Sequence, residues 1–235
     1  MPQYVGVPIY DHATDTIWTL AEHKRVLYHI YLKDDMICPP LLDFPVMPEG
    51  LSAEEVHMSP GVKKLFKGTT RLDCGADAII RVLDEDPTVV LKYALPTPLA
   101  RARLGNEFAL LRYMQHLPLP VPHIKRNAIV DEEGVNLAFY MERLFRCKPT
   151  GDEDVQRTLR QMSEQLHGYG ICHNDLREPN LMQDATSALV LIDFGRSGFI
   201  GQPIPIDLED KHAIEAANRS FVIRANVEAV SCAFD

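Results

Sequence analysis

Short segments rich in β-branched and apolar residues follow one another from residue 65 and predict β-strands. They cover residues 65–73, 78–84 and 88–94. Cys-Gly-Ala at 74–76 and Glu-Asp-Pro at 85–87 separate them, and both tripeptides favour turns. We therefore predict a meander of three antiparallel strands in this part of the chain.

A longer pattern at helical spacing comes next, over residues 99–117. Its apolar positions recur every three or four residues, as expected for a helix with one buried face; they are Leu104, Phe108, Leu111 and Met114. Two further predicted strands, 127–131 and 136–142, are joined by a turn at Glu-Glu-Gly. The segments together predict a five-stranded antiparallel sheet, with the helix between its third and fourth strands.

The second half of the chain predicts fewer strands. Residues 152–168 have apolar positions spaced by three and four residues, which predicts a helix with one buried face. A polar loop over 172–180, an apolar strand over 188–194 and a helical run over 207–224 follow. A small β-rich lobe followed by a helical lobe is an α+β arrangement. We expect a cleft at the junction near residues 142–152, because small-molecule sites usually form between lobes.

The first 60 residues have a different character. Residues 17–32 predict an amphipathic helix, and the stretch 38–60 is rich in proline and should be irregular. We interpret residues 1–60 as an N-terminal extension of a domain that spans 61–235. The apolar content of 17–32 favours an extension that packs on the main body, and the alternative is a removable tail.

Composition narrows the classes of function. The chain has 235 residues and a formal net charge of −9, which argues against sequence-independent nucleic-acid binding, since this needs a surplus of Lys and Arg. No stretch approaches the roughly 20 apolar residues of a membrane span, and the N-terminus lacks the pattern of a secretory signal. The five cysteines have no CxxC spacing, which favours free thiols. We therefore expect a cytoplasmic or nuclear protein without direct membrane or nucleic-acid binding.

The most informative chemistry lies in His173–Asn180 and in the Asp-Phe-Gly of 193–195. The first segment reads HxDxxxxN, and the two occur in the order and at the separation of the catalytic loop and metal motif of protein kinases. Over about residues 65–224 the sequence therefore resembles the protein-kinase-like superfamily. The resemblance implies a bilobal fold with a five-stranded antiparallel N-lobe (61–142) and a truncated helical C-lobe (145–235).

The resemblance also implies a role for each polar residue of these motifs. Asp175 corresponds to the catalytic base, which orients a hydroxyl group and accepts its proton. Asn180 and Asp193 correspond to the ligands of Mg²⁺, a cation that takes oxygen ligands. Arg177 stands where many protein kinases carry a lysine that contacts the γ-phosphate, and His173 is expected to brace the loop.

The N-lobe is expected to complete an ATP site. Lys92 in the third strand and Glu107 in the helix should form an ion pair that fixes the ammonium against the α- and β-phosphates. The phosphate loop is reduced to Gly75 and Ala76 within Gly-Ala-Asp-Ala. Its glycine permits a tight turn with amide groups facing an anion. This reduced loop resembles that of the small kinase of the KEOPS tRNA-modification complex and, more loosely, that of RIO-type kinases.

The junction between the lobes resembles a kinase hinge, and it reads Phe-Tyr-Met-Glu-Arg-Leu over 139–144. By this resemblance Met141 lies at the back of the ATP pocket. The Glu142 carbonyl and the Leu144 amide lie at the adenine edge. The alternative is a plain edge strand.

The segment after Gly195 contains no Ala-Pro-Glu motif and is too short for the peptide-docking platform of a conventional protein kinase. Within it, Leu-Glu-Asp-Lys at 208–211 again resembles the small KEOPS kinase. We therefore expect a minimal, atypical kinase fold.

Three functions remain open. The leading one is Mg²⁺- and ATP-dependent transfer of a phosphoryl group to a hydroxyl acceptor, either a protein Ser/Thr or a small molecule. The second is a pseudokinase or ATP-gated interaction module that works through a protein partner, which the thin glycine loop and the missing activation segment favour. The third is a small-molecule kinase of the aminoglycoside or choline phosphotransferase type, although those usually carry a larger helical lobe.

Overall fold

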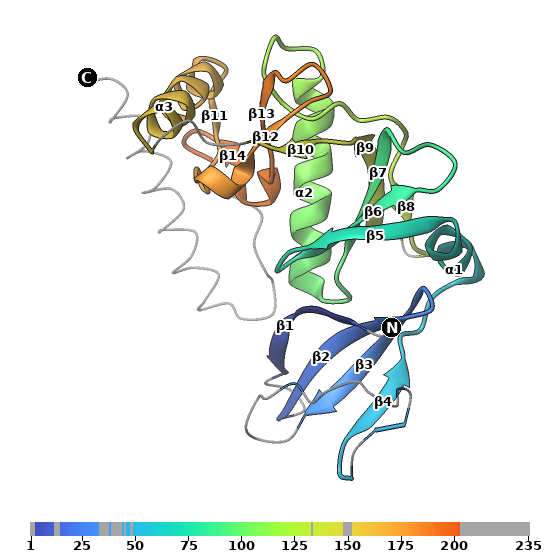
Figure 1. Cartoon of the computed structure of the whole chain (residues 1–235). Coiled ribbons are helices and arrows are strands. Elements are labelled where there is room, and N and C mark those ends of the chain that lie inside the picture. Colours follow the sequence, from blue (N-terminus) through green and yellow to red (C-terminus); the bar gives the residue numbers. More distant parts are fainter. Residues whose placement is uncertain are drawn as a thin grey trace.

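The chain forms two lobes and an additional N-terminal sheet, as the computed structural model shows (Figure 1). The structure describes residues 3–202 except 12–14, 33–37, 39–43, 45, 48, 133 and 148–151. The helix expected over 207–224 and the motif at 208–211 lie outside the described residues. No described helix is long and apolar enough to cross a membrane.

The N-lobe contains a five-stranded sheet that is antiparallel throughout, as predicted. Its strands, in spatial order, are β5 (Thr69–Cys74), β6 (Ala78–Leu83), β7 (Val89–Ala94), β9 (Asn136–Glu142) and β8 (Ile129–Val130). Helix α2 (Pro98–Met114) connects β7 to β8 and packs on β7 and β9. The predicted kinase-like fold class is thereby confirmed for this lobe.

Local sequence explains where α2 begins and which face it buries. The Thr97 hydroxyl accepts a hydrogen bond from the Ala100 amide at 3.1 Å, and proline follows at the first helical position. Both features are typical of a helix start. Leu104, Phe108 and Leu111 are buried on the face toward the sheet, which gives the helix its anchorage.

The strand predicted over 65–73 begins only at Thr69, because Pro60–Lys67 form helix α1. The Ser59 hydroxyl accepts a hydrogen bond from the Val62 amide at 3.4 Å. Serine at the N-cap followed by proline is typical of a helix start. The sequence analysis missed this helix because the preceding stretch is rich in proline.

The prediction of a helix over 17–32 is wrong. These residues form β2 (Thr16–His23) and β3 (Val26–Leu32), the middle strands of a four-stranded sheet completed by β1 (Gln3–Asp11) and β4 (Ser52–Glu55). Lys24 and Arg25 between them have φ angles of 50° and 65°. Two successive positive φ angles make a tight hairpin turn that matches the twist of the strands.

One face of this N-terminal sheet packs on the N-lobe. Leu20 and Leu27 belong to the same buried core as Phe66 of α1 and Ile79 of β6. The opposite face has a small core of its own, formed by Ala21, Ile30 and Phe44. The described part of the first 60 residues is therefore packed on the main body.

A buried arginine joins the two sheets. Arg81 of β6 has no exposed surface, and its guanidinium donates to Glu22 Oε2 at 2.7 Å and to Thr69 Oγ1 at 2.8 Å. The same group lies over the Phe66 ring, 4.2 Å from its centre. A buried charge is tolerated only when it is paired and hydrogen-bonded, so Arg81 requires the N-terminal sheet to be in place.

The C-lobe contains helix α3, which spans the predicted residues Asp152–Gly168 and lies at the end of the molecule opposite the N-terminal sheet (Figure 1). The short strands around it are β10 (Phe145–Arg146), β11 (Ile171–Cys172), β12 (Leu181–Gln183), β13 (Leu189–Leu191) and β14 (Gly198–Phe199). Two 3₁₀ turns, η1 (Glu178–Asn180) and η2 (Phe194–Arg196), interrupt them. The strand predicted over 188–194 ends early, because the chain leaves the extended conformation at Asp193, where φ is 69°.

The buried pair predicts a large cost when its carboxylate is removed. We expect Glu22→Gln to lower the free energy of unfolding by about 3 kcal/mol, since it leaves the Arg81 charge buried without its partner. Chemical denaturation measures the loss. Glu55→Gln, which breaks an exposed pair with Lys63, is the matched control and should cost no more than about 0.5 kcal/mol. Equal losses in the two variants would show that Glu22 does not compensate a buried charge.

Candidate active site

A cleft of about 630 Å³ lies between the five-stranded sheet and the C-lobe. Apolar side chains line it from both lobes and from the segment that connects them: Leu72, Ile80, Val90, Met141, Leu144, Leu181, Met182 and Ile192. Lys92 and Glu107 are the charged residues that line it from β7 and α2. An apolar slot with a few convergent polar groups is the usual form of a small-molecule site.

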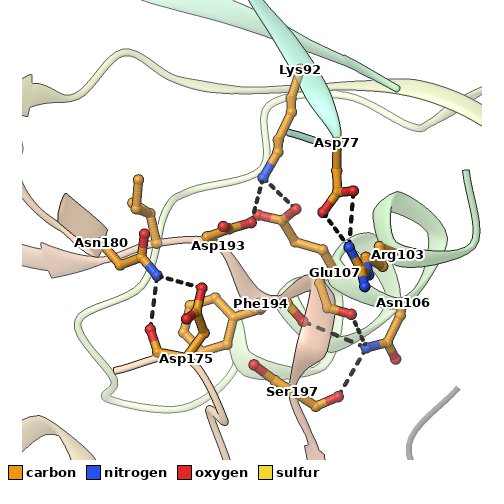
Figure 2. Close-up of polar contacts among 12 residues, drawn as sticks. Asp77, Lys92, Arg103, Asn106, Glu107, Asp175, Asn180, Asp193, Phe194 and Ser197 are labelled. Carbon is orange, nitrogen blue, oxygen red and sulfur yellow. Dashed lines mark hydrogen bonds and ion pairs between the residues drawn. The ribbon is translucent and has the colours of Figure 1, made fainter. Parts of the chain in front are cut away.

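Two of the charged side chains that line the cleft, Lys92 of β7 and Glu107 of α2, meet a third, Asp193, which precedes η2 and is not itself among the lining residues (Figure 2). Lys92 Nζ lies 2.5 Å from Glu107 Oε2 and 3.2 Å from Asp193 Oδ1. The ion pair expected between Lys92 and Glu107 is therefore present, and Asp193 joins it as a third member. The side chains of Lys92 and Glu107 are 12% and 3% exposed, so the pair is almost fully removed from water.

The close packing shifts the pKa of all three groups. Burial acts to lower the pKa of Lys92, but the carboxylates of Glu107 and Asp193 outweigh it and hold the pKa above its ordinary value. Burial raises the pKa of Glu107, against the opposing effect of Lys92. The Lys92 ammonium holds the pKa of Asp193 below its usual value. Lys92 and Asp193 therefore stay charged at neutral pH.

Asp193 has an unusual backbone conformation for a residue other than glycine. Its φ and ψ are 69° and 60°, which is the left-handed region. Such a conformation costs free energy and persists only where the surroundings fix it. Here Phe194 is buried against the His173 ring, with ring centres 4.7 Å apart, and His173 Nε2 lies 2.9 Å from the Ile192 carbonyl oxygen. His173 thus contacts both sides of Asp193, in keeping with the bracing expected of it.

The loop before η1 brings three further predicted residues together. Asn180 Nδ2 donates to the Asp175 backbone oxygen at 2.8 Å and to its Oδ2 at 3.1 Å. Arg177 Nε lies 3.2 Å from the same Oδ2. Because the amide nitrogen of Asn180 is engaged, its Oδ1 is left as the atom that can coordinate a cation. Amide and carboxylate oxygens, the atoms that Asn180 and Asp193 offer, are of the type that Mg²⁺ takes as ligands.

The predicted phosphate loop is closed by its own hydrogen bond. The Gly75 amide donates to the Ala78 carbonyl at 2.8 Å, so this amide is not available to an anion in the present turn. Neither Gly75 nor Ala76 is among the residues that line the cleft, whereas the neighbouring Leu72 and Asp73 are.

Only some of the predicted hinge residues line the cleft. Met141 and Leu144 line the cleft, as expected. The Glu142 carboxylate turns to the His123 amide instead and accepts a hydrogen bond at 2.8 Å. Only the backbone of Glu142 is therefore left for the role expected of it.

Sequence reasoning missed two residues of α2 that contact the site (Figure 2). Arg103 binds both carboxylate oxygens of Asp77, at 2.9 and 3.0 Å, and so ties the turn after β5 to the helix. Asn106 donates to backbone carbonyls of the η2 segment, including that of Ser197 at 2.9 Å. The spacing of Arg103 four residues before Glu107 places both on one face of the helix, and this was the available signal. Contacts of a side chain with distant backbone carbonyls leave no sequence pattern.

The glycine of the Asp-Phe-Gly segment packs closely on α2. A Cβ atom at Gly195 would lie 3.2 Å from Arg103 Cβ and 3.5 Å from the Arg103 carbonyl oxygen. We expect Gly195→Ala to lower the free energy of unfolding by about 1–3 kcal/mol, as overpacking does. Chemical denaturation tests this. The control is Gly168→Ala, since a Cβ at Gly168 meets no atom within 4 Å. A Gly195→Ala variant as stable as this control would contradict the prediction, because it would show that α2 and η2 can move apart to accommodate the methyl group.

Comparisons with known proteins give one family match and similarity to solved structures. Residues 93–206 match the family model of the RIO domain, a segment just under half of the chain that includes Glu107, Asp175, Asn180 and Asp193. No curated protein matches the sequence. Among solved structures, a chain of the CAK complex from Chaetomium thermophilum bound to ATP-γ-S is 18% identical with a TM-score of 0.43. The alignment covers 57% of this chain and 47% of that one. The two lobes and the cleft between them agree with a protein-kinase-like fold, and residues 93–206 are similar to the RIO domain.

Proposed function

We propose that the protein is a Mg²⁺- and ATP-dependent phosphotransferase of minimal, atypical kinase type. Its acceptor is a hydroxyl group, and the Ser/Thr of a protein is the acceptor class that we favour. The observation that carries the proposal is the meeting of Lys92, Glu107 and Asp193 at 2.5 and 3.2 Å at the edge of an apolar cleft. Phosphoryl transfer depends on such fixed charges rather than on covalent chemistry by the protein.

The apolar part of the cleft suits an adenine ring. Ile80 and Val90 line the cleft from the sheet, and Met182 and Ile192 line it from the C-lobe. Among the described residues no hydrogen bond of the Leu144 amide is found, so this amide is able to donate to the ring. Adenine would then pack between the lobes and pair with the hinge backbone of Glu142 and Leu144.

The polar end of the cleft suits the triphosphate. Lys92 would contact the α- and β-phosphates, and Glu107 holds its ammonium in place. Asn180 Oδ1 and the Asp193 carboxylate are the groups that would hold Mg²⁺. The chemistry that Mg²⁺ would supply there is neutralisation of the negative charge of the phosphates. The lowered pKa of Asp193 keeps this carboxylate ionised and ready for a cation.

Asp175 would act on the acceptor hydroxyl. Its Oδ2 accepts from Asn180 and pairs with Arg177, which leaves Oδ1 to accept the hydroxyl proton. The contact with Asn180 holds the carboxylate in a fixed direction, as a general base requires. Arg177 is 58% exposed and would neutralise charge on the γ-phosphate.

A second candidate is an ATP-binding module without turnover, working through a protein partner. The turn after β5 favours it, because the Gly75 amide is engaged and the Asp77 carboxylate lies in the same turn, although Arg103 neutralises it. The two candidates differ in one measurement. Release of ADP at saturating Mg-ATP with a protein or small-molecule acceptor supports the phosphotransferase, and its absence with intact ATP binding supports the module.

We expect Asp193→Ala to abolish the thermal stabilisation that Mg-ATP gives to the protein, because it removes the charged ligand of the ion. Each variant is compared with its own melting temperature without ligand, since Asp193 also contacts Lys92. Glu164→Ala, on the exposed side of α3, is the control and should keep the full ligand-induced shift. A normal shift in Asp193→Ala would remove this residue from the metal site.

We expect Asp175→Asn to lower turnover by about 100-fold or more, the usual contribution of a general base. Binding of Mg-ATP should stay close to that of the wild type, because Asp175 is not proposed to bind the nucleotide. Rates of ADP release and calorimetric titration with Mg-ATP separate the two effects. Full activity in Asp175→Asn would show that another group accepts the proton.

A further inference from the structure

Asn106 of α2 is the residue next to Glu107, and its side chain reaches the segment that follows Asp193 (Figure 2). Asn106 Nδ2 lies 2.9 Å from the Ser197 carbonyl oxygen, 3.1 Å from that of Gly195 and 3.5 Å from that of Phe194. One side-chain amide therefore lies within hydrogen-bond distance of three backbone carbonyls of a single turn. Neighbouring residues of one helix thus touch the two sides of the site: Glu107 holds Lys92, and Asn106 holds the Asp193 segment.

The turn that Asn106 contacts is held on its other side by the catalytic loop. Asn174 Nδ2 donates to the Arg196 carbonyl at 3.1 Å, and the Ser197 hydroxyl donates to the His173 carbonyl at 2.9 Å. Gly195 also lies close to α2, since a Cβ atom at this position would lie 3.2 Å from Arg103 Cβ. Since the turn continues directly from the left-handed Asp193, its position decides where the Asp193 carboxylate lies.

We propose that Asn106 is a positioning residue of the proposed metal site: its amide fixes the 194–197 turn against α2 and thereby holds the Asp193 carboxylate toward Lys92 and the cleft. This inference rests on the proposed function for the role of Asp193, but the contact itself belongs to the protein without any ligand. Residues behind a metal ligand commonly change metal affinity by about 10- to 100-fold when they are replaced.

A residue that only stabilises the fold would behave differently. Its loss would lower the melting temperature and leave the response to Mg²⁺ unchanged. A positioning residue affects the metal-dependent part of nucleotide binding and spares the metal-free part, since the apolar slot for the ring lies elsewhere in the cleft. The two roles are therefore separated by comparing nucleotide binding with Mg²⁺ and with a chelator.

Asn106→Asp is the sharpest variant, because a carboxylate of the same size cannot donate and faces three carbonyl oxygens. Asn106→Ala removes the contact without repulsion and serves if the first variant does not fold. We expect the Mg²⁺ concentration for half-maximal ATP binding to rise by about tenfold. Affinity for ADP in the presence of a chelator should change by less than about twofold. Asn106→Gln, which keeps the donor group, should recover part of the Mg²⁺ response.

Hydrogen exchange tests the contact without any nucleotide. In Asn106→Ala the backbone amides of 194–197 should exchange about tenfold faster, while those of α3 keep their wild-type rates. Asn127→Ala, at an exposed asparagine outside the site, is the control and should change neither region. This readout separates the present inference from the proposed function. If the wild type fails to bind Mg-ATP, the proposed function is wrong, and the exchange rates still decide the role of Asn106.

Two results would overturn the inference. One is exchange over 194–197 that is unchanged in Asn106→Ala. The other is an equal loss of metal-free and Mg²⁺-dependent nucleotide binding in the variants, which would assign Asn106 to general stability.

Discussion

The desolvated ion pair between Lys92 and Glu107 is the constraint on which the site depends. Removing two charges from water is costly, and such a pair persists only with excellent geometry and further polar partners. The geometry requires β7, which carries Lys92, and α2, which carries Glu107, to lie at one fixed separation. Asp193 adds a second carboxylate to one ammonium. The resulting surplus of negative charge at the edge of the cleft is the kind of site that attracts a cation.

Packing around the pair explains why this separation is maintained. The apolar face of α2 is buried against β7 and β9, and its polar face meets η2, where Gly195 permits close approach. On the far side of the sheet, Arg81 of β6 is buried under the N-terminal sheet and paired with Glu22. The N-lobe sheet thus carries a buried charge on each face: Arg81 lies toward the N-terminal sheet, and Lys92 lies toward the cleft.

The parts of the fold that rest on long periodic patterns could be predicted from the sequence. Helix α3 was predicted with the bounds that it has, because its apolar positions define one face over 17 residues. The hairpin of β2 and β3 was missed because its turn is formed by Lys24 and Arg25, whereas such a turn usually contains glycine or asparagine. In the site, the Lys92–Glu107 contact followed from the motif. The contact of Asn106 did not, since it joins a side chain to backbone carbonyls that sequence does not encode.

Helix α2 contacts three different parts of the site. Arg103, Asn106 and Glu107 lie within five residues of one helix and reach the turn after β5, the η2 segment and Lys92. A movement of the helix as a whole would shift all three groups together. Their contributions to stability are therefore not expected to be additive, as is usual for residues that share one element. The position of α2 therefore bears at once on Lys92, on the η2 segment that follows Asp193 and on the turn after β5.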